Sequence, residues 1–459
     1  MRNYLLASAA LLGLVAVSTA QAATFATSDP SRNSSAFNAT QTKPEPGKII
    51  VRLGGLVAVD VGAIGSTSDK SSVTGAKLQP YGIAGYFRLY FGVDGKLTNG
   101  MIYGANSEMR TNFAGGAPGG YNGAIAAGSA GVGNASANST ASLWYTRRAY
   151  VYIGGDSWGL VRIGQGDGPI SLFTGNGITT GEAYDTGQWD GDICDFISAG
   201  CLSWAFLDVG NEYDSAKITY LSPVFGGLQL GVSFAPSSAA LSGIDGQTAI
   251  GGGSARQSAS VVASDLQRPR NIYEIAARWQ GNLGPVAVDT MAAYYGSGVV
   301  TPASGAAIAA GVTKVYGMGL FDAGLSLTYM GASVFGHVNT GHGNGQAGTP
   351  QVQLASGRKK DQMGYIVGAQ YSNGPYTVGT SYYSLDSQGA NGGTGNRSEK
   401  GFDIGGQYTV VPGLDFFLEY IYGLRHQNGV NFVDGGAGAA TANNKITTNA
   451  VLATMLVRW

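Results

Sequence analysis

Apolar and polar residues alternate along most of the chain with a period of two, which predicts β-strands that have one apolar and one polar face. The last eleven residues, NAVLATMLVRW, alternate in this way and stop on Trp459. In the segments 401–411 and 414–422 the polar face carries Asp403, Asp415 and Glu419. Residues 47–65 place Arg52 and Asp60 on one face, and the other face holds Ile49, Val51, Leu53, Val57, Val59 and Val61.

About sixteen such segments follow one another, and the segments between them alternate between short and long. Very short turns, such as SNGPY (372–376) and VVPGLD (410–415), join the strands of a pair. Long stretches rich in Gly, Ser, Asn and Ala, such as 110–140 and 236–268, separate the pairs. Short turns at one end and long loops at the other are typical of an outer-membrane barrel. The sequence therefore predicts an all-β protein, a transmembrane antiparallel β-barrel of about sixteen strands.

A barrel also explains the apolar last strand. An unpaired backbone N–H or C=O in lipid costs several kcal/mol, so a sheet that crosses the membrane has to close on itself. We expect residues 449–459 to pair with the first strand, near residues 48–64, and Trp459 to lie at the membrane interface.

The N-terminus predicts export from the cytoplasm. Arg2, an apolar stretch from about Leu5 to Val17 and the small-residue site Ala20-Gln21-Ala22 have the pattern of a cleaved signal peptide, residues 1–22. Residues 23–46 have no periodicity and many Ser, Thr, Asn and Pro residues, so we interpret them as a flexible leader. The barrel domain then covers residues 47–459.

Composition agrees with a membrane barrel. Charged residues make up only 12% of the chain, glycine accounts for 75 of 459 residues, and 25 tyrosines outnumber 16 phenylalanines. Tyrosine-rich girdles at both membrane interfaces are characteristic of such barrels. The mean hydropathy of +0.03 is expected, since lipid-facing and lumen-facing residues cancel. The formal charge of −1 gives no reason to expect a nucleic-acid partner.

Two cysteines, Cys194 and Cys201, lie close together in DICDFISAGCLSW. In an oxidising compartment such a pair is most simply a disulfide that closes one loop. A metal site would need further ligands, and the three histidines are far away in the sequence. We therefore expect no metal and no cofactor.

Three stretches carry a resemblance to the Gram-negative general porins, which are trimeric barrels of sixteen strands. LWYTRRAYVYIGGDSWGLVRIGQGDGP (143–169) resembles a porin strand with the pattern T-R-x-A-aromatic-V, its turn and the strand that follows. AKITYLSPVFGGLQLGVSF (216–234) is similar to a porin hairpin, and FRLYFGVDGKL (87–97) to a porin strand with an inward arginine. The terminal aromatic, Trp459, resembles the signal that the barrel assembly machinery reads.

The resemblance implies a water-filled channel that the third long loop narrows, with basic residues on the wall facing acidic residues on that loop. The loop would be residues 171–211, with Glu182, Asp185, Asp190, Asp192 and Asp195. Arg88 and Arg147 match inward arginines of the family, and alternation adds further residues, so the expected basic wall is Arg52, Arg88, Arg147, Arg162, Lys217 and Arg278. Arg148 is expected to face outward, toward a subunit interface or lipid headgroups.

The sequence offers little for catalysis. GNGQAG (343–348) matches a dinucleotide fingerprint, but no helix pattern follows it. We predict a porin, not an enzyme, in the cell outer membrane, which lets ions and small hydrophilic solutes diffuse passively. It would be a homotrimer in contact with membrane lipid and lipopolysaccharide, and the density of Asp190, Asp192 and Asp195 favours cations. The alternatives are a substrate-selective channel, for instance a sugar track near Tyr86 and Tyr90, a plugged structural or adhesive barrel, and an outer-membrane hydrolase.

Overall fold

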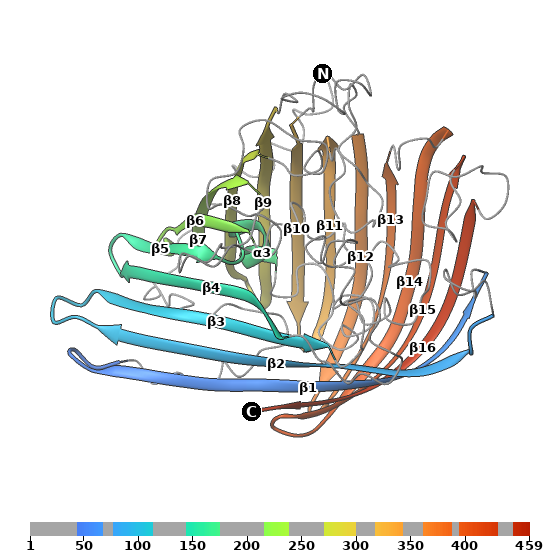
Figure 1. Ribbon diagram of the computed structural model, residues 1–459, viewed down its shortest axis with the longest axis horizontal. Coiled ribbons are helices and arrows are strands. Elements are labelled where there is room, and N and C mark those ends of the chain that lie inside the picture. Colours follow the sequence, from blue (N-terminus) through green and yellow to red (C-terminus); the bar gives the residue numbers. More distant parts are fainter. Residues whose placement is uncertain are drawn as a thin grey trace, which may run out of the picture.

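The computed structural model describes residues 44–67, 77–112, 144–174, 215–237, 270–299, 317–342, 361–387, 394–429 and 444–459. Its strands form one closed antiparallel barrel (Figure 1), in which each of the sixteen strands pairs with its neighbours in the sequence and β16 pairs with β1. The predicted fold class and strand number are confirmed.

The strands are long enough to cross a bilayer, which takes about 9–11 tilted residues, except for β5 and β6. Their bounds are β1 (Ile49–Ser66), β2 (Tyr81–Lys96), β3 (Ile102–Asn112), β4 (Trp144–Gly155), β5 (Gly159–Gln165), β6 (Ala216–Leu221), β7 (Leu228–Ser237), β8 (Arg270–Leu283), β9 (Val286–Gly298), β10 (Gly319–Tyr329), β11 (Ala332–His342), β12 (Asp361–Asn373), β13 (Tyr376–Ser387), β14 (Thr394–Val411), β15 (Leu414–Asn428) and β16 (Lys445–Arg458).

Short and long connections alternate around the ring, as the sequence predicts. Two residues join β12 to β13, and two join β14 to β15. Each of these turns contains a glycine with positive φ, Gly374 at 59° and Gly413 at 90°, a conformation that other residues rarely adopt. By the layout of outer-membrane barrels, the short-turn end faces the periplasm.

The chain closes through its first and last strands. Leu56 lies opposite Arg458, and the pairing continues in register to Ser66 opposite Thr448. The backbone N–H of Gly55 donates to the carbonyl of Trp459 at 3.0 Å, and the N–H of Trp459 donates back to Gly55 at 3.1 Å. The predicted partner of the last strand is therefore confirmed, and the described sheet has no open edge there.

The two faces of the wall differ as the alternation predicts. On β16, Val451 and Met455 are exposed on the outer face, whereas Leu452 and Leu456 are 1% exposed on the inner face. The same division recurs on β1 and β15, where the outer residues are apolar or aromatic. The outer face is suited to lipid, and the inner face carries most of the charge.

Trp459 packs on the outer face across the closing seam. Its ring lies 5.8 Å from that of Phe87, and a Cβ on residue 55 would come within 2.5 Å of the indole, so Gly55 leaves room for the ring. We expect Trp459→Ala to lower the free energy of unfolding by about 0.5–1.5 kcal/mol, the value of one aromatic pair. Urea unfolding in detergent micelles measures this, with Trp459→Phe as the ring-retaining control. Equal stability of the two variants would contradict this role of the ring.

The chain turns into the barrel after β5. The short helix α3 (Pro169–Thr174) lies inside the ring of strands and packs mainly on β8, with further contacts to β6, β7 and β9 (Figure 1). Ile170, Leu172 and Phe173 are nearly fully buried in one cluster with inner-face residues such as Leu221 and Tyr295. An apolar patch on the inner wall thus holds the first residues of the inward segment. Among the described residues, no helix is long and apolar enough to cross a membrane.

Candidate pore lining

The inner faces of β1 to β6 carry a row of cations, which we call the basic wall. Arg88, Arg162 and Lys217 are 4–6% exposed, and the side chain of Arg52 is 14% exposed. The described members of the basic wall are Arg52, Arg88, Arg110, Arg147, Arg148, Arg162 and Lys217. Arg278, the remaining predicted residue, faces inward from β8 and pairs with Asp289. All of the predicted basic residues therefore reach the inner side of the barrel.

Arg148 does not face outward, so that expectation is wrong. Glu108 lies opposite Arg148, and the next residue, Met109, lies opposite Thr146, so Arg147 is an extra residue in a β-bulge. A bulge interrupts the alternation and lets two successive side chains turn to the same side. The amide of Gln165 donates to the carbonyls of Thr146 at 3.1 Å and Arg147 at 2.9 Å, which satisfies the backbone at the bulge.

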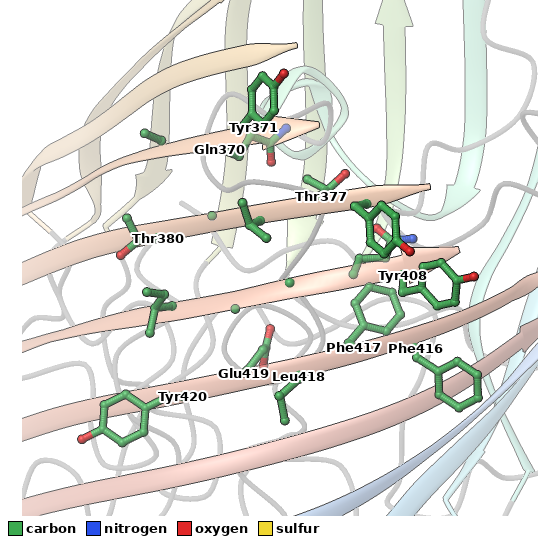
Figure 2. A pocket seen from close by; sticks show the side chains of 18 of the residues that line it. Gln370, Tyr371, Thr377, Thr380, Tyr408, Phe416, Phe417, Leu418, Glu419 and Tyr420 are labelled. Atoms are coloured by element: carbon green, nitrogen blue, oxygen red, sulfur yellow. The ribbon is translucent and has the colours of Figure 1, made fainter. Parts of the chain in front are cut away.

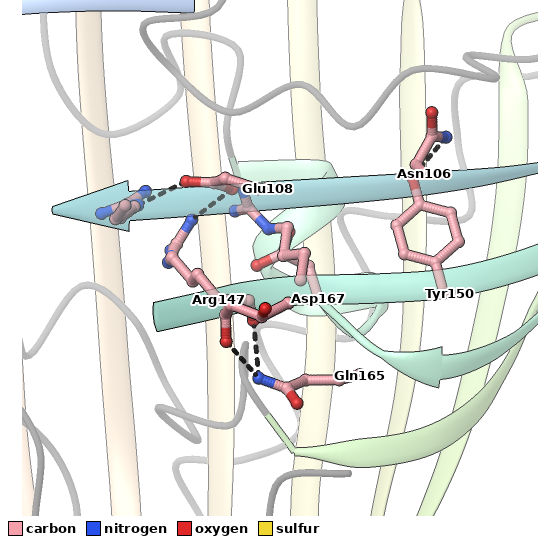
Figure 3. A network of polar contacts seen from close by, with 9 residues as sticks. Asn106, Glu108, Arg147, Tyr150, Gln165 and Asp167 are labelled. Carbon is pink, nitrogen blue, oxygen red and sulfur yellow. Dashed lines mark hydrogen bonds and ion pairs between the residues drawn. The ribbon is translucent and has the colours of Figure 1, made fainter. Parts of the chain in front are cut away.

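Three arginines converge on one carboxylate at this bulge (Figure 3). Glu108 accepts from Arg147 Nη1 at 3.3 Å, and it also accepts from Arg148 Nη1 and Arg110 Nε. The side chain of Glu108 is 3% exposed, and those of the three arginines are 6–13% exposed. One carboxylate cannot neutralise three guanidinium groups, so the cluster keeps a positive charge. The sequence did not single out Glu108 or Arg110, because strand 102–112 has weak apolar alternation.

A second network ties the basic wall together nearer the short turns. Arg52 Nη2 donates to Asp94 Oδ1 at 2.9 Å and to Asn106 Oδ1 at 3.1 Å. Asn106 Nδ2 donates to the Tyr150 hydroxyl at 3.0 Å, as Figure 3 shows, and the Tyr152 hydroxyl donates to Asp94. These contacts fix long side chains that would otherwise move freely in the lumen.

Two polar contacts anchor the segment that leads into α3. Asp167 pairs with Arg148 Nε at 2.6 Å. Glu274, on β8 and 4% exposed, accepts from the backbone N–H of Ile170 at 3.1 Å, and Lys217 Nζ lies 3.9 Å from its carboxylate. A Cβ on Gly168 would lie 2.0 Å from Glu274 Oε1, so the chain passes directly over this carboxylate. The inward turn is thus fixed from both β4 and β8.

Carboxylates gather on the inner faces of β10 to β16, and β10 to β14 of this group stand across the lumen from the basic wall. Strands eight positions apart in the closed order, such as β5 and β13, stand across the lumen from each other. Inward carboxylates outnumber inward arginines on β10 to β16, and several are held by partners: Asp403 accepts from Ser381 Oγ at 2.7 Å, and Asp322 is bonded to His337. We call this set the acidic wall: Asp322, Glu399, Asp403, Asp415 and Glu419, all 0–2% exposed.

The remaining predicted site residues lie outside the described residues. These are the loop acids Glu182, Asp185, Asp190, Asp192 and Asp195, and the cysteines Cys194 and Cys201. Within the described ranges, no group of three or more histidine, cysteine, aspartate or glutamate side chains is arranged to hold a metal ion.

Comparison with known proteins gives the family. A model of the Gram-negative porins matches residues 7–428 of the chain. The chain belongs to this family. A comparison with curated protein sequences finds no match.

Several solved structures share the fold. This porin aligns with Salmonella typhi OmpF in complex with daunomycin at a TM-score of 0.53 and 12% identity, over 89% of this chain and 97% of that one. It aligns with the outer-membrane channel DcaP of Acinetobacter baumannii at 0.53 and 12%, over 91% and 100%. The trimer form of OmpT of Vibrio cholerae aligns at 0.50 and 10%, over 90% and 99%. At such identities the likeness concerns the fold.

Family and fold together give the general function. This porin is an outer-membrane barrel that forms a channel for passive diffusion of small solutes. They indicate a channel rather than an enzyme.

Proposed function

We propose that segment 171–211 narrows the lumen and that solutes pass between its acids and the basic wall. The observation that carries this proposal is the position of α3, whose last four residues open the segment and lie against the inner face of β8. The contacts of Glu274 with Ile170 and of Arg148 with Asp167 direct the chain into the lumen instead of away from the membrane.

Opposed charges across a narrow wet gap create a transverse electric field. Such a field orders water and dipolar solutes, and the excess charge of the lining sets the ion preference. The acidic wall adds to the negative side that the acids of the segment would form. We therefore propose a preference for cations among small hydrophilic solutes.

A sugar-selective channel is the second candidate, and the contacts of Tyr86 and Tyr150 argue against a sugar track on these two rings. The guanidinium of Arg88 lies 4.4 Å from the centre of the Tyr86 ring, and that of Arg162 lies 4.9 Å from the Tyr150 ring. Ring faces that stack on arginine are not available to stack on a sugar. Among the described residues, no observation favours the plugged barrel or the outer-membrane hydrolase.

We also propose a homotrimer that contacts lipopolysaccharide and is assembled by the machinery that reads Trp459. The solved OmpT of Vibrio cholerae, described as a trimer form, supports the subunit number through the shared fold.

Single-channel recording in a planar bilayer under a salt gradient tests the proposal. We expect open steps in groups of three and a reversal potential that favours cations, and the double variant Asp190→Asn/Asp192→Asn should weaken that preference. Asp156→Asn, in the exposed turn between β4 and β5, is the control that should change nothing. Silent bilayers from folded protein would refute the open pore, and an unchanged reversal potential in the double variant would refute the role of the segment.

A further inference from the structure

The outer face of the barrel has a groove near its short-turn end, across β12 to β16 (Figure 2). It encloses about 920 Å³, within the range of about 300–1,000 Å³ of small-molecule sites. Its floor lies at Gly406, which stands between Val378 on β13 and Leu418 on β15 in the paired strands. A missing side chain at this position hollows a wall that is otherwise covered by large residues.

Aromatic rings bound the hollow. Figure 2 shows Tyr408 and Phe416 at one end of the groove and Tyr420 at the other. Tyr376 stacks on Tyr408 with a centroid distance of 4.9 Å, which makes that end rigid. Because β12–β13 and β14–β15 turn directly beyond these two tyrosines, that end lies at the periplasmic interface of the membrane.

The outward-facing lining is mostly apolar, and two of its hydroxyls are already bonded within the wall: Thr380 Oγ1 donates to the Asp403 carbonyl at 2.7 Å, and the Tyr420 hydroxyl donates to Asn449 Oδ1 at 2.8 Å. Val378, Ile404 and Leu418 are each more than half exposed, because nothing in the described part of the chain covers them. Glu419, the charged residue of the lining, points to the lumen and is 1% exposed. The outward face of the groove therefore offers apolar contact along its length and tyrosine hydroxyls at its periplasmic end.

We propose that this groove binds one phospholipid of the periplasmic leaflet, with an acyl chain over Gly406 and the ester or phosphate oxygens at the tyrosine hydroxyls. The outer-membrane location places this face against lipid. A second barrel has a convex outer face, which would rest on the rims at Tyr408 and Phe416 and leave the floor uncovered. A thin, flexible acyl chain follows the floor. Since no charged group among the described lining residues faces outward, the site selects lipids by their acyl chain and not by the charge of the headgroup.

Native mass spectrometry of the protein extracted from outer membranes in mild detergent tests this site. The wild type should keep one phospholipid per chain, with phosphatidylethanolamine and phosphatidylglycerol in the proportions of the membrane. Gly406→Leu fills the floor and should lose this lipid. Its Cβ would meet Thr377 O at 3.1 Å and Val378 Cγ1 at 3.4 Å, so the barrel has room for it after a small adjustment.

Gly336→Leu is the matched control, because Gly336 is another outward glycine, on β11 and three strands from the floor of the groove at Gly406, with its nearest neighbours at 3.6 Å. This variant should keep the lipid, and both variants should keep wild-type conductance. No retained phospholipid in the wild type, retention by Gly406→Leu, or retention of lipopolysaccharide or of anionic lipid alone would overturn the proposal. Loss of oligomers in Gly406→Leu would instead identify a second copy of the chain as the occupant.

Discussion

Glu108→Gln is expected to destabilise the barrel by about 3–5 kcal/mol, the cost of removing one partner of a buried ion pair. Arg110, Arg147 and Arg148 all meet at this carboxylate, and its removal leaves their charges facing one another at low exposure. Urea unfolding in detergent micelles, followed by heat-modifiable mobility on gels, measures the change. Glu45→Gln is the control, since Glu45 pairs with Lys48 where both side chains are 70% exposed, and it should be nearly neutral.

The same substitution should move the reversal potential toward anions, since it adds one net positive charge to the basic wall. Arg110→Gln should move the reversal potential in the opposite direction and cost less stability, because two arginines still pair with Glu108. If both variants shift the potential in the same direction, the cluster acts through the shape of the pore and not through its charge. If Glu108→Gln is as stable as the wild type, water in the lumen screens the arginines.

The side of the wall on which each residue lies could be predicted because lipid makes alternation nearly compulsory. Arg52 and Asp60 on β1, and Asp403 and Glu419 on β14 and β15, lie where the period of two places them. Closure by β16 followed from the same physics, since an unpaired edge in lipid is too costly.

The residues that the sequence misplaced or missed depend on contacts between strands. Arg148 faces inward because the bulge at Arg147 adds one residue to the strand. A bulge cannot be recognised from the alternation of apolar and polar residues in the sequence. Alternation gave the side of Asp403 but not what lies across the lumen from it, which depends on ring order and strand stagger. In the sequence, Glu274 is likewise only one polar residue of a strand. Its contact with the backbone N–H of Ile170 depends on the fold and could not be predicted.

Gly168→Ala should release the start of the inward segment, although it adds only one methyl group. The new Cβ would lie 2.0 Å and 2.3 Å from the two carboxylate oxygens of Glu274, and the end of that side chain is the part that can move. The displaced carboxylate would lose its hydrogen bond from the Ile170 N–H. A hydrogen bond to a charged group contributes about 1.5–3 kcal/mol, so we expect a loss of stability in this range and a segment that is held less firmly.

Single-channel recording should show the functional consequence as larger current noise and closure at lower voltage in Gly168→Ala and in Glu274→Ala. Glu274→Gln keeps an acceptor oxygen for Ile170 and should stay close to the wild type, which separates the hydrogen bond from the attraction to Lys217 at 3.9 Å. Gly65→Ala is the control for adding a methyl group, since a Cβ there meets nothing within 4 Å. Unchanged noise and closing voltage in Gly168→Ala would mean that the apolar contacts of Ile170, Leu172 and Phe173 hold the segment without Glu274. Glu274 would then contribute only its negative charge to the lumen and would not hold the segment in place.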